Sequence, residues 1–414
     1  VRVATTDELG ATSTQLFSVT IVDSNDAPTT KSEVVEFTIP EGQSWSSLTW
    51  DRVYGGVGED SLAKMIPAHD GGYLLAGSSD SNISHDKTEA SRGGKDFWLV
   101  KIDEGGDVLW DKRYGGSEDD NCSGIIPTAD GNYLLYGASV SPADGDKTQG
   151  LQGSNDFWII KIDENGSKIW DKRYGGGSED KCLYALELEN GDFALSGYSR
   201  SGISGDKTHG SLGHTDSWLI RVDENGTKIW DHTYGGDFFD FAIKVEVVSD
   251  GNWLVFGYSS SNPGNSKTAT KKGGDDYWVI KVNHENGSMI WDKSYGGASY
   301  DYFDDALVQE DGSFIMVGLS YAASGNTGDR QSTAKGESSD LWVVKADANG
   351  SILWERSYGG EKGVGWNSRI IPLGGQGFLI SSGASGQATG DISGGQRNTG
   401  DSDSDYWLIK IDQY

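Results

Sequence analysis

The sequence has few cysteines and few cations for its length. Its two Cys residues form no CxxC pair and no Cys/His spacing of the kind that holds zinc, so a zinc site is not indicated. The 34 Lys and Arg residues stand against 63 Asp and Glu, a net charge of −29. This balance excludes a basic nucleic-acid surface and electrostatic attraction to anionic lipid. No apolar run approaches the ~18 residues that a membrane span requires.

A repeated motif is what the sequence has in abundance. "WDKRYGG" occurs twice, and its six copies begin at Trp50, Trp110, Trp170, Trp230, Trp291 and Trp354. Successive copies are therefore 60, 60, 60, 61 and 63 residues apart. A fixed period of this size predicts one array of equal units over residues 47–414, with repeats starting near 50, 110, 170, 230, 291 and 354.

Each repeat contains four short apolar runs separated by Gly, Asn and Asp, the composition of strands and turns. Asn-Gly pairs such as "ENGS" (Glu164–Ser167) predict tight hairpins. We therefore expect an all-β fold, a six-bladed β-propeller of four-stranded antiparallel blades. The last repeat lacks a fourth strand, and residues 47–55 are expected to supply it and close the ring.

The pattern GG-x-x-x-D followed by D-x-W-x-x-K-x-D resembles the bacterial β-propeller repeats of secreted and surface-anchored proteins. The resemblance covers residues 47–414 and implies an extracellular or cell-surface location. The sixth repeat departs from the pattern, because "YGGEKGVGWNS" lacks the Asp and "GDISGG" replaces "GDKT". Any site built on these residues is expected to be incomplete in that repeat.

Residues 1–28 have no counterpart in the repeats. Their end, "DSNDAP" (Asp23–Pro28), resembles the closing hairpin and linker of a cadherin-like domain, an Ig-like β-sandwich. The resemblance implies that Asp23, Asn25 and Asp26 ligate calcium, while the alternative is that they cap a turn before the proline. Residues 29–46 are expected to be a connecting segment, and the chain a fragment of a longer multi-domain protein.

The tryptophans occupy two positions of the repeat. Because large flat rings fill the space between blades, we expect both sets to pack rather than to bind a ligand. The first set precedes the fourth run and consists of Trp98, Trp158, Trp218, Trp278, Trp342 and Trp407. The second set opens the motif and consists of Trp50, Trp110, Trp170, Trp230, Trp291 and Trp354.

Repeated carboxylates gather on the rim that carries the long loops. One set follows "YGG": Asp60, Asp120, Asp180, Asp240 and Asp301. Another belongs to "GDKT": Asp86, Asp146, Asp206 and Asp329, with Ser266 in the fourth repeat. Both sets are candidates for ligand or calcium binding, and the alternative is hydrogen bonding to turn amides. A third set, the Asp of D-x-W, is expected to be architectural.

Other candidates occur once. His209 and His214 share a loop and could form a lone metal site with nearby Asp residues. Aromatic residues near the fourth and fifth long loops could serve a saccharide site: Tyr300, Tyr302, Phe238 and Phe239. Cys122 and Cys182 are equivalent core positions, and either buried free thiols or a disulfide is compatible with their spacing.

No catalytic constellation recurs, since the six His residues never share a repeat position. The sequence therefore predicts a non-catalytic extracellular binding or adhesion module, with calcium as the one cofactor considered. A polysaccharide or a cell-surface protein is the expected partner. The alternatives are a structural subunit of a surface filament or layer, self-assembling through residues 1–28, and a polysaccharide hydrolase or lyase.

Overall fold

The computed structural model shows a chain of two compact units, Val1–Arg52 and Val53–Tyr414. The first unit contains a two-stranded antiparallel sheet, β1 (Arg2–Thr6) and β2 (Thr12–Leu16). The structure describes residues 2–6, 12–16, 50–321, 326–374, 377–385, 389–392 and 404–412. The predicted calcium ligands Asp23, Asn25 and Asp26 lie outside these ranges.

Six antiparallel sheets follow one another in the second unit, and we number them 1 to 6 in chain order. Sheet 1 contains β3 (Asp60–Pro67), β4 (Tyr73–Ser79), β5 (Asp96–Ile102) and β6 (Val108–Tyr114). Sheet 2 contains β7 (Asp120–Pro127), β8 (Tyr133–Ser139), β9 (Asp156–Ile162) and β10 (Lys168–Tyr174). Sheet 3 contains β11 (Asp180–Glu187), β12 (Phe193–Ser199), β13 (Asp216–Val222) and β14 (Lys228–Tyr234).

The remaining sheets have the same strand order. Sheet 4 contains β15 (Asp240–Val247), β16 (Trp253–Ser259), β17 (Asp276–Val282) and β18 (Met289–Tyr295). Sheet 5 contains β19 (Asp301–Val308), β20 (Phe314–Tyr321), β21 (Ser339–Ala346) and β22 (Ile352–Tyr358). Sheet 6 has three strands, β23 (Arg369–Pro372), β24 (Phe378–Ser385) and β25 (Ser404–Ile411).

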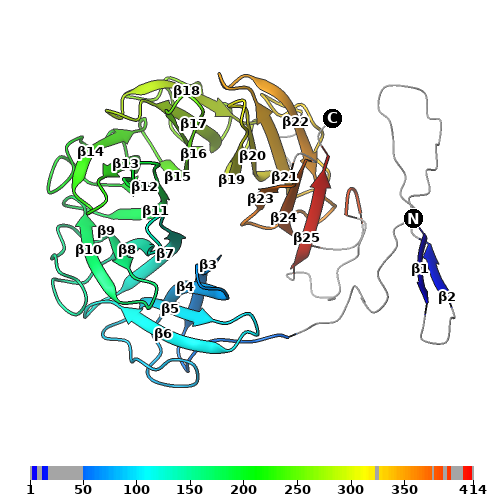
Figure 1. Cartoon of the computed structure of the whole chain (residues 1–414). Helices are drawn as coiled ribbons and strands as arrows, with labels where there is room; N and C mark the ends of the chain where they lie inside the picture. Colours follow the sequence, from blue (N-terminus) through cyan, green and yellow to red (C-terminus); the bar gives the residue numbers. More distant parts are fainter. Residues whose placement is uncertain are drawn as a thin grey trace, which may run out of the picture. The chain divides into compact units, whose positions relative to one another are not determined.

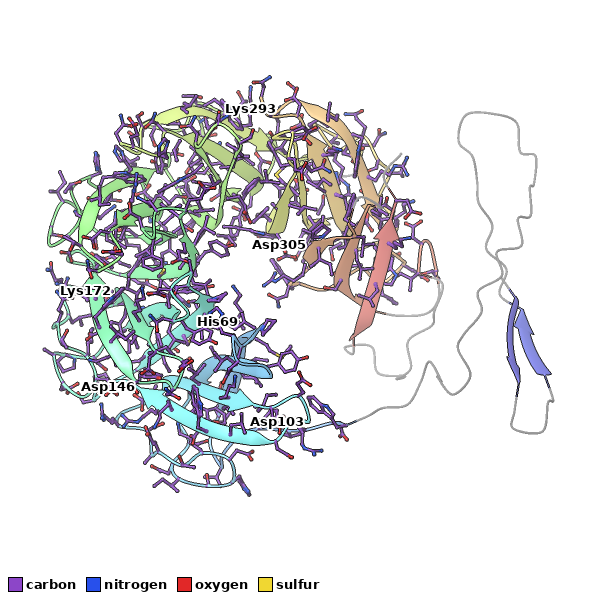
Figure 2. The ribbon with its side chains drawn as sticks, in the orientation of Figure 1. His69, Asp103, Asp146, Lys172, Lys293 and Asp305 are labelled. Carbon is purple, nitrogen blue, oxygen red and sulfur yellow. The ribbon has the colours of Figure 1, made fainter. Side chains whose placement is uncertain are left out.

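The sheets are arranged around a common centre, with the first strand of each sheet innermost (Figure 1). The first strands of consecutive sheets contact one another from β3 to β23. Figure 2 shows the same order in the side chains, since Asp305 of β19 lies toward the centre and Lys172 of β10 and Lys293 of β18 lie outside. The predicted all-β antiparallel fold is confirmed, and the arrangement is consistent with a β-propeller.

The core lies between adjacent sheets because the middle strands are apolar on both faces. Every residue of β9 is buried, as every residue of β8 is. Phe157 of sheet 2 contacts Trp218 of sheet 3 with ring centroids 4.8 Å apart. Trp158 and Trp218 are fully buried, so each fills the space between its own sheet and the preceding one.

The Tyr of "YGG" links each of sheets 1 to 4 to the next one. Tyr114 Oη donates a hydrogen bond to Gly166 O at 2.6 Å, and Tyr174 Oη to Gly226 O at 2.6 Å. These acceptors are the glycines of the Asn-Gly turns, with φ of 77° and 74°. A positive φ favours Gly, which has no Cβ. The glycine therefore forms the tight turn and also presents the carbonyl that the tyrosine of the preceding sheet binds.

The two ends of the array expose faces that are buried elsewhere. Leu62 of sheet 1 is 63% exposed, whereas its counterparts Cys182, Ala242 and Phe303 are at most 2% exposed. Leu408 of sheet 6 is likewise 63% exposed. Residues 50–55 of the expected closing segment form no strand, and residues 47–49 lie outside the described part of the chain.

A carboxylate on the fourth strand fastens the long loop to its sheet. In sheet 2, Asp171 Oδ2 accepts hydrogen bonds from Thr148 N at 2.9 Å and from Trp158 Nε1 at 3.1 Å. Its Oδ1 accepts one from Lys168 Nζ at 2.9 Å. We call this carboxylate the loop lock. Its equivalents, each accepting from a third-strand tryptophan, are Asp111, Asp231, Asp292 and Glu355.

We expect Asp171→Ala to lower the free energy of unfolding by about 3 kcal/mol, because it leaves a buried indole N–H and a backbone N–H without acceptors. Urea denaturation followed by tryptophan fluorescence measures the change. Glu164→Ala, at an exposed turn position of the same sheet, should change stability by less than about 0.5 kcal/mol. Equal effects of the two substitutions would contradict the role of the loop lock.

Candidate functional site

The Asp residues that follow "YGG" are bound to the chain itself. Asp120 Oδ2 accepts hydrogen bonds from Gly116 N at 2.7 Å and from Ser141 Oγ at 2.9 Å. Asp120, Asp180, Asp240 and Asp301 are fully buried, and Asp60 is half-buried. Equivalent bonds from a glycine N–H reach Asp60, Asp180, Asp240 and Asp301. This set joins the rim loops to the first strands.

The "GDKT" Asp residues also accept backbone bonds, but they are more exposed and meet cations. Asp206 Oδ2 accepts from Gly175 N at 3.2 Å and pairs with Arg173 at 2.9 Å. Asp146 pairs with Arg92 of the preceding sheet at 2.7 Å and with Arg113 of that sheet at 3.6 Å. Asp86 and Asp329 accept from Gly55 N and Gly296 N. Calcium binding by this set stays a prediction.

Burial changes the protonation of the third Asp set. Asp96 and Asp156 each have a pKa raised to about 6, and Asp276 has one raised to about 7, chiefly because burial removes their carboxylates from water. The Lys of the long loop lies close to these groups. Burial lowers the pKa of Lys207 to about 8, and its Nζ lies over the Trp218 ring, 5.3 Å from the centroid.

The junction between sheets 3 and 4 differs from those before it. Where the earlier junctions hold the pairs Arg113/Asp146 and Arg173/Asp206, this junction holds Thr233 and Ser266. Both partners of the ion pair are replaced by small side chains. Ser266 Oγ keeps the bond to the backbone, accepting from Gly235 N at 2.8 Å. The space that the Arg side chain fills elsewhere is therefore free.

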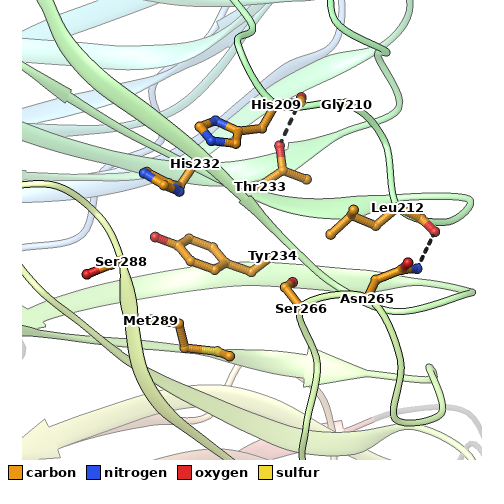
Figure 3. Close-up of a pocket in the computed structure, with 10 residues that line it drawn as sticks. All are labelled: His209, Gly210, Leu212, His232, Thr233, Tyr234, Asn265, Ser266, Ser288 and Met289. Carbon is orange, nitrogen blue, oxygen red and sulfur yellow. Dashed lines mark hydrogen bonds between the residues drawn. The ribbon is translucent and has the colours of Figure 1, made fainter.

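A pocket of about 460 Å³ occupies this junction (Figure 3). Its volume lies in the range of small-molecule sites. The long loops of sheets 3 and 4, strand β14 and the turn before β18 all contribute to it. The lining residues are His209, Gly210, Leu212, His232, Thr233, Tyr234, Asn265, Ser266, Ser288 and Met289.

Two imidazoles form one wall of the pocket. The rings of His209 and His232 are stacked with centroids 4.3 Å apart, and His232 is also stacked on Tyr234 at 5.9 Å (Figure 3). Burial, followed by the charge of His209, lowers the pKa of His232. The equivalent residues of sheet 1, Glu89 and Lys112, form an ion pair at 3.7 Å instead. The wall is thus a stack of aromatic rings where its counterpart is an ion pair.

The other single candidates form separate groups, since Tyr300 stacks on Tyr302 and Phe238 contacts Phe239. His214 packs against Phe238 and Phe239, away from the His209/His232 stack. The cysteines are free thiols, and burial raises the pKa of Cys122 to about 12. Within the part of the chain that is described, no three or more His, Cys, Asp and Glu side chains are grouped so as to hold a metal ion.

Sequence reasoning missed His232 and Thr233. A signal for them existed, because Arg to Thr and Asp to Ser changes occur together in consecutive repeats. Positions 233 and 266 are far apart along the chain, however, and only the packing of sheet 4 on sheet 3 makes them neighbours.

The comparisons with known proteins are distant. No model of a known protein family matches the chain. A stretch of 205 residues, 47% of the chain, is 29% identical to the regulatory protein FlaEY of Caulobacter vibrioides. The match spans only 21% of that protein's length. No helix in the described ranges is long and apolar enough to cross a membrane.

Among solved structures the similarities are also weak. The WD40 domain of Neurospora crassa Pan2 has 11% identity and a TM-score of 0.41, with 78% of this chain and 75% of that chain covered. Kuenenia stuttgartiensis hydrazine synthase has 9% identity and a TM-score of 0.44, with coverages of 80% and 79%.

We expect the raised pKa of Asp276 to make stability depend on pH. Below the unfolded pKa of 3.8 the carboxyl is protonated in both states, so its burial costs no charge desolvation. As the pH rises, the unfolded state ionises first, and the loss of folding stability reaches its full size above about pH 7, where the folded state ionises too. Asp276→Asn removes the charge at every pH. Its free energy of unfolding relative to wild type should therefore be higher at pH 8 than at pH 5, by on the order of 2 kcal/mol.

Urea titrations of both proteins at the two pH values measure this difference. Taking the difference between variant and wild type cancels the other groups that titrate, including His232. Ile83→Ala, which removes an exposed side chain that does not titrate, serves as the control and should show the same relative stability at both pH values. A relative stability of Asp276→Asn that falls between pH 5 and pH 8 would contradict the assignment.

Proposed function

We propose that the six sheets close into a six-bladed ring, with residues 47–55 as the fourth strand of the last blade. The exposed faces at Leu62 and Leu408 support closure, since the position of Leu62 is buried in sheets 3, 4 and 5 and that of Leu408 is buried in sheets 1 to 5. Tyr54 Oη donates to Gly106 O at 2.7 Å, the bond that each fourth-strand tyrosine makes to the following sheet. This bond supports the proposed role of residue 54 at the end of a fourth strand.

Closure should protect a thiol placed on either end face. We expect Leu62→Cys and Leu408→Cys to react at least tenfold more slowly with a maleimide than Ile83→Cys, which lies on a long loop and is 68% exposed. The wild-type cysteines give the background rate. Labelling of Leu62→Cys as fast as that of Ile83→Cys would show that the ring stays open.

The ring is proposed to act as a non-catalytic extracellular binding or adhesion module of a larger bacterial surface protein. One observation carries this proposal. At the junction of sheets 3 and 4, Ser266 replaces the long-loop Asp that pairs with an Arg or Lys at each of the other four junctions between described sheets, and a lined pocket is present there. Losing a partly buried ion pair does not help the fold, so a ligand is the better explanation for the change.

The chemistry of the pocket points to a neutral ligand with a polar edge. Stacked imidazoles beside Tyr234 offer flat faces, while the polar side chains of Asn265, Thr233 and Ser266, which are also hydrogen-bonded to the backbone of the loops and of β14, line its edge. A sugar unit of a polysaccharide fits this lining, and so does a polar side chain of a surface protein. These are the two classes of partner that we propose.

Restoring the lost ion pair tests the pocket directly. Thr233→Arg combined with Ser266→Asp recreates the Arg173/Asp206 pair, whose atoms are 2.9 Å apart, and should fill the pocket without unfolding the chain. We expect the double variant to lose at least tenfold in affinity for whichever polysaccharide or surface protein wild type binds. Arrays of microbial polysaccharides and of purified surface proteins, each with calcium and with a chelator, supply the ligands.

The reverse change is the matched control. Arg173→Thr with Asp206→Ser alters the preceding junction and should leave binding unchanged. Undiminished binding by Thr233→Arg/Ser266→Asp would rule out the pocket as the site. Absence of binding to every member of both arrays would contradict the proposed function itself.

A further inference from the structure

A chain of aromatic rings runs along the long-loop rim from sheet 3 to sheet 6. Successive ring centroids are 5.3 Å apart for Tyr198 and Phe241, 4.9 Å for Phe241 and Tyr258, and 5.3 Å for Tyr258 and Tyr302. Trp366 continues the chain at 4.8 Å from Tyr302. We call this set, together with Tyr300 and Tyr321 beside Tyr302, the aromatic arc.

The arc is not needed to join the sheets. The positions of Phe241 and Tyr302 are occupied by Ser61 in sheet 1 and Asn121 in sheet 2. At the junction of those sheets the contact is polar, with Cys122 N donating to Ser78 Oγ at 2.8 Å. Sheets 1 and 2 therefore pack together without aromatic rings at this rim.

Two rings of the arc are held open to solvent. Tyr300 is 49% exposed and Trp366 is 53% exposed, although each contacts other rings on one side. Tyr300 lies parallel to Tyr302, with an interplanar angle of 5°. Contiguous exposed apolar surface on a protein marks an interaction site more often than it serves the fold.

Hydrogen bonds fix the orientation of two rings of the arc, Tyr198 and Tyr302. Tyr198 Oη donates to Glu179 Oε1 at 2.8 Å, and Glu179 pairs with Arg200 at 2.6 Å. Burial, followed by the charge of Asp275 and a hydrogen bond to it, raises the pKa of Tyr302. A platform whose rings are already oriented loses little conformational entropy when a ligand stacks on it.

We propose that the aromatic arc is a stacking platform for a neutral polysaccharide. This inference rests on the proposed binding function and names its ligand class. Aromatic faces take the C–H faces of sugar rings, and the carboxylates of Glu179 and Asp275 at the edge of the arc accept sugar hydroxyls. The same carboxylates, in a chain of net charge −29, repel an anionic polymer such as a nucleic acid or an acidic glycan.

The test compares exposed rings with exposed aliphatic residues. We expect Tyr300→Ser/Trp366→Ala to lose at least tenfold in affinity for a neutral polysaccharide in a panel of β-glucan, mannan, xylan and agarose. Tyr300→Phe/Trp366→Tyr keeps the rings and should retain affinity within threefold. Ile83→Ala/Ile203→Ala, which removes loop side chains that are 68% and 74% exposed, is the control for surface changes. Thermal unfolding checks that all variants are folded.

Each outcome decides between the inference and the function on which it rests. Loss in the ring-removing variant alone supports the aromatic arc as the platform. If Thr233→Arg/Ser266→Asp loses binding while the ring-removing variant keeps it, the arc is overturned and the binding function stands. Binding only to alginate, an acidic glycan, or only to a surface protein also overturns the arc alone. Binding to no polysaccharide and no surface protein overturns both.

Discussion

Sheets 1 to 5 each depend on the loop lock, the fourth-strand carboxylate that accepts hydrogen bonds from a tryptophan indole and from a long-loop amide. Ordering a loop of this length costs conformational entropy at every residue, and few of its own side chains are apolar enough to offset that cost by burial. Asp171 lowers that cost at one point by holding Thr148 against the third strand. The rest of the loop is then positioned by short-range turns, and its outer surface is left free to vary.

The lock works only because opposite charges are buried together behind it. Lys207 lies between the Trp218 ring and the carboxylates of Asp180, Asp216 and Asp231, all of which raise its pKa against the larger effect of burial. In sheet 5 an arginine, Arg330, replaces the lysine and pairs directly with buried Asp340. A buried cluster of this kind fixes geometry more than it adds stability, because desolvation offsets much of the attraction. The raised pKa of the D-x-W carboxyls is the sign of that cost.

The repeat period, the strands and the Asn-Gly turns could be predicted from the sequence, because they depend on residues that are close together in the chain. Asn-Gly pairs and two-sided apolar runs act within one repeat, and the sheets form where they indicate. Contacts between repeats were harder to predict. For example, the hydrogen bonds that Asp120 accepts from Gly116 and Ser141 depend on the geometry of the loops. Positions 233 and 266 face each other because of the way in which sheet 4 packs on sheet 3. A short stretch of sequence carries no information about this packing.

The differences between sheets are more informative than the repeats. Sheets 1 and 2 show what the fold requires. They are joined by an Arg/Asp pair, and at the long-loop rim they have serine, asparagine and alanine where later sheets have aromatic rings. Each departure from that pattern in the later sheets removes an interaction between sheets or exposes apolar surface. Thr233 and Ser266 give up an ion pair, and Tyr300 and Trp366 leave large rings half exposed. A repeat protein with identical blades would present the same rim all the way round, so selection for a ligand has to act on such departures.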